Sequence, residues 1–125
     1  MRLIKHFREL DVYKAAFTFQ QMIFELSKKW PAEERYALTD QVRRSSRSIG
    51  ANLAESWAKR RYPAHFLSKL TDADGELQET RHWINSAKTC CYLSDEQAAE
   101  LDEQAGAVGG MLGNMIVNYE SFCLH

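Results

Sequence analysis

The strongest constraint on the fold is a helical apolar periodicity that recurs in four segments, with no sustained strand-like alternation anywhere in the chain. The segments cover approximately residues 7–30, 39–59, 63–91 and 94–122, and the gaps between them are short. Amphipathic helices joined by short links bury their apolar stripes by packing around one core. The sequence therefore predicts an all-α protein, an antiparallel up-down four-helix bundle, in one domain over residues 1–125.

Proline and capping residues predict where the helices begin and end. Pro31 cannot continue the first helix, whereas Pro63 suits the first turn of a helix and marks the start of the third. Thr39 has the position and type of an N-cap for the second helix. The stretch "SDEQ" predicts a capping box between Ser94 and Gln97 at the start of the fourth.

Composition favours a globular protein of the cytoplasm. No apolar run approaches the roughly 18 residues of a membrane span. The N-terminal "MRLIKHFREL" has neither the apolar core nor the cleavage site of a signal peptide. Cys90, Cys91 and Cys123 are odd in number and form no C-x-x-C pair, so we expect reduced thiols in a cytoplasmic location, with no membrane partner.

Charge is distributed unevenly along the chain, although its formal total is only −1. Residues 1–70 hold 14 Lys and Arg against 7 Asp and Glu, while residues 71–125 hold 2 against 10. The near-neutral total argues against a protein that coats nucleic acid by bulk electrostatics. We expect the two halves to neutralise each other, within one chain or between copies, which still leaves room for a basic outer face.

The second and fourth helices carry small residues on the side away from the expected core. In the second helix the expected core stripe is Val42, Ser46, Ile49, Leu53 and Ser56, and the far side holds Ala51, Ala54 and Ala58. In the fourth helix Gly106, Gly110 and Gly113 form a strip opposite the apolar face. Each Gly costs about 1 kcal/mol of helix propensity relative to Ala. We expect the strip to contact another subunit, and the alternative is a tolerated cluster of surface glycines.

Asn52 and Glu55 lie on the flank between the two faces of the second helix. We expect both to be at least partly buried and to bond to neighbouring helices or loop backbone. An unpaired polar group there would cost about 1 to 3 kcal/mol.

The sequence contains no recognisable catalytic or metal centre. The one suggestive motif is "ETRH", Glu79 to His82, a Glu-x-x-His of the type found in di-iron bundles, but such sites need a second copy of the motif. Cys90 and Cys91 have no zinc-site spacing with His82. No phosphate-binding glycine loop or nucleophile elbow occurs. We therefore predict no catalytic residue, no metal, no cofactor and no enzymatic activity.

Basic residues on and after the second helix predict a nucleic-acid contact. They are Arg43, Arg44, Arg47, Lys59, Arg60 and Arg61, the last three within the aromatic-flanked "WAKRRY". Arginine can bind phosphate bidentately and aromatic rings can stack on unpaired bases, so the composition suits RNA or single strands. The alternative is that Arg43 and Arg47 form ion pairs with acidic groups such as Asp72, Asp74 or Glu76, either across the bundle or at a subunit contact.

Four blocks of the chain also resemble a known family. They are "LDVYKAA" at 10–16, "WPAEERYALTDQVRRSSRSIGANLAE" at 30–55, "GELQE" at 75–79 and the terminal amphipathic helix. Together they resemble the S23-like four-helix proteins encoded in intervening sequences of bacterial 23S ribosomal RNA genes. The second block is the specific one, because the family reads approximately Phe-Pro, Glu, Tyr-Gly-Leu, Gln, two basic residues, Ser-Ile and Asn-Ile-Ala-Glu-Gly at these spacings. Ser56 replaces the family's last Gly, and Glu76 replaces the Ser of its Gly-Ser-Leu.

This resemblance implies a closed ring, a homopentamer, without an established enzymatic activity. It also implies that Asn52, Glu55 and Glu79, which match polar positions of the family, are structural. The accessory protein of diversity-generating retroelements is distantly similar and acts with a reverse transcriptase and RNA. We therefore expect an oligomeric accessory or scaffold protein whose partners are its own copies and RNA or a nucleic-acid-processing protein. The alternative is a purely protein-binding scaffold.

Overall fold

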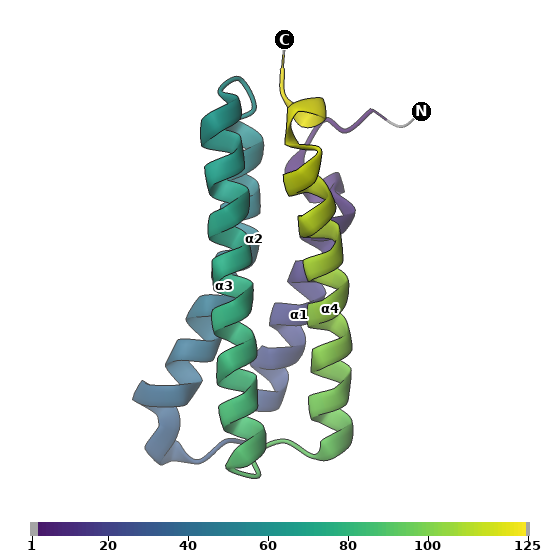
Figure 1. Cartoon of the computed structure of the whole chain (residues 1–125). Helices are drawn as coiled ribbons and strands as arrows, with labels where there is room; N and C mark the ends of the chain where they lie inside the picture. Colours follow the sequence, from purple (N-terminus) through teal and green to yellow (C-terminus); the bar gives the residue numbers. More distant parts are fainter. Residues whose placement is uncertain (1–2, 125) are drawn as a thin grey trace.

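The structure is a computed structural model that describes residues 3–124, and it is built from four long helices. These are α1 (Asp11–Ser27), α2 (Asp40–Ala58), α3 (Pro63–Thr89) and α4 (Asp95–Val117). No strand occurs within the described range, which confirms the predicted all-α class. The helices lie side by side (Figure 1), with α2 packed on α1 and α3, and α4 packed on the same two helices.

One apolar core lies between the four helices. The predicted inner stripe of α2 is confirmed, since Val42, Ser46, Ile49, Leu53 and Ser56 are all buried. Large side chains of all four helices meet it, and the following are less than 2% exposed: Phe19, Ile23, Phe66, Leu70, Leu77, Leu101, Val108 and Leu112. Burial of such side chains contributes roughly 1.5–3 kcal/mol each, so this core is the main source of stability.

The first helix is shorter than its apolar pattern predicts. A 3-10 turn over Phe7–Glu9 comes first, and Leu10 then takes an extended conformation that separates this turn from α1. The buried side chain of Leu10 still joins the core, which explains why it fits the apolar pattern without being helical. At the other end, the Ser27 hydroxyl donates to the Phe24 carbonyl oxygen (3.1 Å) in the last turn.

The predicted N-cap at Thr39 is wrong. Thr39 has helical backbone angles and its side chain makes no cap bond, because the chain is already helical before it. After Pro31 the chain forms a 3-10 turn over Ala32–Glu34 and then a π-helical turn over Arg35–Thr39, which runs directly into α2.

The remaining helix ends follow the sequence closely. Pro63 is at the first turn of α3, as predicted. The capping box is confirmed, because the Gln97 backbone N–H donates to Ser94 Oγ and the Ser94 N–H donates to Gln97 Oε1, each at 3.0 Å. The α3 C-terminus closes where Cys91 takes a left-handed conformation (φ 64°) and the Tyr92 N–H donates to the carbonyl of the last helical turn.

Both described ends of the chain lie at one end of the bundle, together with the connection between α2 and α3 (Figure 1). The Leu124 N–H donates to the Arg60 carbonyl oxygen (3.0 Å) and ties the C-terminal segment to this connection. The α1–α2 and α3–α4 connections lie at the opposite end. None of the helices within residues 3–124 combines the length and apolar character needed to cross a membrane.

Candidate nucleic-acid interface

The six basic residues predicted to contact nucleic acid form two separate clusters. Arg43, Arg44 and Arg47, the arginine cluster, lie on the N-terminal half of α2. Lys59, Arg60 and Arg61, the corner cluster, follow the end of α2 in its connection to α3. At about 1.5 Å per helical residue, roughly 18 Å of helix separates the two. They are not one continuous patch, so each is considered in turn.

Arg44 is the member of the arginine cluster that acidic groups neutralise. Its guanidinium donates to Glu76 Oε2 (3.5 Å) and to Glu79 Oε2, and Glu79 also accepts from Trp83 Nε1 (3.2 Å). Desolvation by burial lowers the pKa of Arg44, but attraction and hydrogen bonding from the two glutamates outweigh it and raise the pKa overall. Arg44 therefore links α2 to α3 and has little capacity left for a phosphate.

Arg43 and Arg47 face α1 instead of α3. Arg43 Nε donates to Ser27 Oγ (2.8 Å), and both guanidinium groups lie over the Phe24 ring at 4.8 and 5.4 Å. The alternative in which they pair with the acidic third helix across the bundle is wrong, since within one chain neither has an ion pair with a described carboxylate, and pairing at a subunit contact stays a prediction. Arg43 and Arg47 are one turn apart and share a face, whereas Arg44 lies about 100° away around the helix.

Within the corner cluster, Arg60 is folded against the protein. Its guanidinium carbon lies 3.7 Å from the centre of the Trp57 ring and its Nε donates to the Trp57 carbonyl oxygen (2.9 Å). Burial lowers the pKa of Arg60, an effect that nearby Cys123 partly opposes. Lys59 and Arg61 are exposed, and their side chains have no ion pair with any described residue. These two residues are therefore the free cations of the corner.

An exposed aromatic ring lies beside these cations. Tyr62 is 54% exposed and its ring centre is 5.7 Å from that of His65 in the first turn of α3. The sequence prediction includes Tyr62 through "WAKRRY" but not His65. The sequence feature that could have identified His65 is its position three residues after Tyr62, at the start of a helix. Exposed cations with adjacent rings can bind phosphate and stack on an unpaired base.

The three polar residues matched to family positions differ from one another in structure. Asn52 is half-buried, but its amide donates to the Ser48 carbonyl oxygen (2.9 Å) of its own helix and not to a neighbouring one. Glu55 is exposed rather than partly buried, because its flank faces solvent, and it pairs with Lys69 of α3 at 2.9 Å. Glu79 accepts one bond from Arg44 of the neighbouring α2 and one from Trp83 of its own helix.

The glycine strip of α4 lies on the outside of the bundle. Gly106, Gly110 and Gly113 are exposed, and a Cβ atom at any of them would meet nothing within 4 Å. Gly109, which faces inward, would meet Leu77 at 3.4 Å. Packing within the described part of one chain therefore does not explain why these three positions are glycine.

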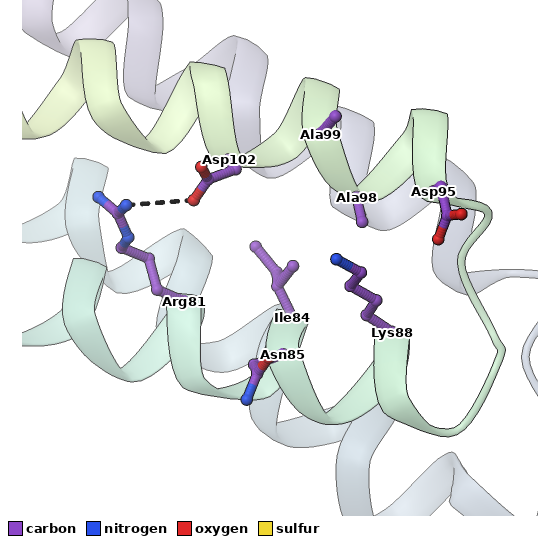
Figure 2. Close-up of a pocket in the computed structure, with 8 residues that line it drawn as sticks. All are labelled: Arg81, Ile84, Asn85, Lys88, Asp95, Ala98, Ala99 and Asp102. Carbon is purple, nitrogen blue, oxygen red and sulfur yellow. Dashed lines mark hydrogen bonds and ion pairs between the residues drawn. The ribbon is translucent and has the colours of Figure 1, made fainter.

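A cleft between α3 and α4 differs from the corner because its lining carries both cations and acids. It has a volume of about 410 Å³ and is drawn in Figure 2. Arg81 of α3 donates to Asp102 of α4 (3.1 Å), and Lys88 lies on the same side as Asp95. Two cations of α3 and two acids of α4 line the cleft, so it offers no net positive charge to a polyanion.

Fold and site together define a small four-helix bundle with a basic, aromatic corner. Over residues 3–124 no three His, Cys, Asp or Glu side chains gather to hold a metal ion. Nothing in the site gives a positive indication of an enzyme.

The chain belongs to the family of 23S rRNA-intervening sequence proteins, whose pattern matches residues 8–114. The resemblance drawn from the sequence is therefore confirmed. Among solved structures, a protein of unknown function from the S23 ribosomal protein family of Bacteroides thetaiotaomicron is similar, with a TM-score of 0.75 and 26% identity. The match covers 84% of this chain and 94% of that protein. No curated protein matches the chain.

Proposed function

We propose that this protein is a non-enzymatic, homo-oligomeric accessory protein that binds RNA through the corner cluster. The observation that carries the proposal is the group of exposed Lys59 and Arg61 beside exposed Tyr62, none of them neutralised by a described carboxylate. The name of the family, which refers to an rRNA intervening sequence, agrees with RNA as the ligand.

The expected binding is electrostatic and tolerant of sequence. The corner offers charge and a stacking ring but no element that enters a groove to read base edges, so phosphate contacts dominate. Affinity should therefore fall steeply with salt. Within the proposed six-residue set, Lys59 and Arg61 carry most of the contact, and Arg44 and Arg60 contribute less because Glu79 and Trp57 already engage them.

Assembly into a closed ring, most simply a homopentamer of antiparallel up-down bundles, is the second part of the proposal. The exposed glycine strip of α4 supports it, as do the exposed side chains Val117 (80%) and Phe17 (46%). Exposed glycine in a helix lowers its stability, and close approach of another backbone offsets that cost. A ring would also repeat the corner cluster, which raises its effective affinity for a polyanion.

Fluorescence anisotropy with a 15-nucleotide single-stranded RNA tests the RNA contact. The variant K59Q/R61Q removes both free cations, and K29Q/K88Q removes two exposed cations at the opposite end of the bundle as the matched control. At about 0.7 per phosphate contact, the slope of log affinity against log salt should fall by about 1.4 in the first variant only. If the wild type fails to bind RNA at low salt, or if both variants lose the same slope, the proposal is wrong.

Light scattering after gel filtration tests the assembly. We expect about five times the subunit mass of 14.4 kDa. Gly110→Gln places a long side chain on the glycine strip and should lower the mass, whereas Gly75→Gln, at another open helical position, should leave it unchanged. A monomeric wild type would refute the ring.

A protein-binding scaffold is the second candidate function. An apolar hollow of about 330 Å³ lies between α1 and α2, lined by Phe7, Tyr13, Phe17, Gly50 and Ala54 among others. Exposed apolar surface of this type marks protein contacts. If the ring forms but RNA does not bind, this face becomes the site to map.

A further inference from the structure

A second basic site lies at the end of the bundle opposite the corner cluster. Where α1 passes through the two short turns into α2, a pocket of about 380 Å³ is lined by Lys28 just after α1, Arg35 at the start of the π-helical turn and Arg43 of α2. Lysine and arginine are its only charged lining residues. Its size lies within the range of roughly 300–1,000 Å³ that is typical of small-molecule sites.

The positive charge of this pocket is mostly uncompensated. Arg43 is held by neutral acceptors, Ser27 Oγ at 2.8 Å and the Phe24 carbonyl oxygen at 3.5 Å, so its direction is fixed while its charge remains. Arg35 is exposed and forms no ion pair with any residue from 3 to 124. Lys28 alone has an acidic partner, Glu25 at 3.2 Å on the exposed side of α1.

Two residues with polar side-chain groups, Trp30 and Thr39, also line the pocket. Trp30 is only 9% exposed, and its indole Nε1 has no hydrogen-bond partner in the described part of the chain. A buried donor without an acceptor costs about 1–3 kcal/mol and calls for an explanation. The buried Thr39 also lines the pocket, and its hydroxyl does not cap α2. Arg35 begins the π-helical turn, a type of irregularity that is common at functional sites.

We propose that this pocket binds a phosphate monoester. The two arginine guanidinium groups offer planar pairs of N–H donors that match phosphate oxygens, and their charge suits a dianion. A pocket of this volume holds more than a phosphate group, so the ligand extends into a sugar-sized substituent beside Trp30 and Pro31. The ligand is either a free nucleotide or the 5′ phosphate at the end of an RNA strand.

The pocket shares Arg43 with the six predicted basic residues, but it lies apart from the corner cluster that carries the proposed RNA contact and does not rest on that contact. The α1–α2 connection and the α2–α3 connection lie at opposite ends of the bundle (Figure 1). A variant at one end can therefore fail while the other end retains its ligand.

Isothermal titration of the full chain with 5′-AMP and with adenosine tests the phosphate contact, since the two probes differ only in the phosphate. Arg35→Gln is the test variant, because its exposed side chain has no described partner and the fold does not depend on it. Arg8→Gln, an exposed arginine that belongs to neither proposed site, is the matched control. The wild type should prefer 5′-AMP over adenosine by about tenfold or more, and Arg35→Gln should remove most of that preference.

A ten-nucleotide RNA with a 5′ phosphate and the same RNA with a 5′ hydroxyl distinguish the two sources. A preference for the phosphorylated strand that Arg35→Gln abolishes and Arg8→Gln retains identifies a strand end as the ligand. Binding of 5′-AMP without that preference identifies a free nucleotide. The proposal is overturned if neither the nucleotide nor the strand shows a phosphate preference, or if Arg8→Gln reduces it as much as Arg35→Gln.

Discussion

Replacing Thr80 by valine tests how α2 and α3 are held together at a buried polar contact. Thr80 Oγ1 lies 2.8 Å from Ser45 Oγ and 2.8 Å from the Glu76 carbonyl oxygen, and Ser45 and Thr80 are both fully buried. Valine has almost the same shape as threonine, so the change removes the hydroxyl without creating a cavity. The loss in free energy of unfolding therefore measures the contribution of the polar contact alone.

The expected magnitude follows from which partners lose a bond. Removing the hydroxyl loses a hydrogen bond worth about 0.5–1.5 kcal/mol and leaves Ser45 Oγ without its donor, so we expect a total of about 1–2 kcal/mol. Ser45 keeps only a long bond to the Val42 carbonyl oxygen at 3.4 Å. Ser45→Ala combined with Thr80→Val removes both polar groups, and the pair should cost about 1 kcal/mol less than the sum of the single changes.

Urea unfolding followed by circular dichroism at one fixed protein concentration measures these differences. Thr71→Val is the matched control, because the Thr71 hydroxyl makes the same type of bond back to its own helix but is exposed (2.8 Å to the Ser68 carbonyl oxygen). We expect it to change the free energy of unfolding by less than about 0.5 kcal/mol. Strictly additive costs, or equal effects at Thr80 and Thr71, would refute the reasoning.

Three further predictions concern the helix ends and one tyrosine. Ser94→Ala removes the cap of α4 and should lower stability by about 1 kcal/mol in thermal unfolding; an unchanged midpoint would contradict this. Cys91→Gly should raise stability by about 0.5–1 kcal/mol, because its left-handed backbone (φ 64°) suits glycine, and a loss of stability would show that the thiol matters more. Tyr92 donates to Glu34 Oε2 (2.9 Å), and this bond raises the pKa of Tyr92 to about 12. Its contribution to stability is therefore complete below pH 10 and is lost as the pH rises towards 12, so ultraviolet titration should show a tyrosine that ionises near pH 12 and whose signal disappears in Tyr92→Phe.

Much of the fold could be predicted from the sequence because it depends on neighbours along the chain. Apolar spacing places the inner stripe of α2, Pro63 starts α3, and Ser94 caps α4. Each of these features is settled within one or two helical turns. Thr39 is a case in which local sequence was not sufficient. Its residue type suits an N-cap, but the turns that begin at Pro31, eight residues earlier, place Thr39 inside the helical segment.

The partners of the polar groups, in contrast, were decided only by the tertiary structure. The sequence places Arg43, Arg44 and Arg47 together, but the rotation of α2 in the bundle turns Arg44 to the acids of α3 and the other two to Phe24 of α1. Stacking of Arg60 on Trp57 likewise leaves Lys59 and Arg61 as the free cations of the corner. The physical reason is that residue spacing determines the face on which a side chain lies, whereas the helix that covers this face, and hence its charge, depends on packing between segments far apart in the chain.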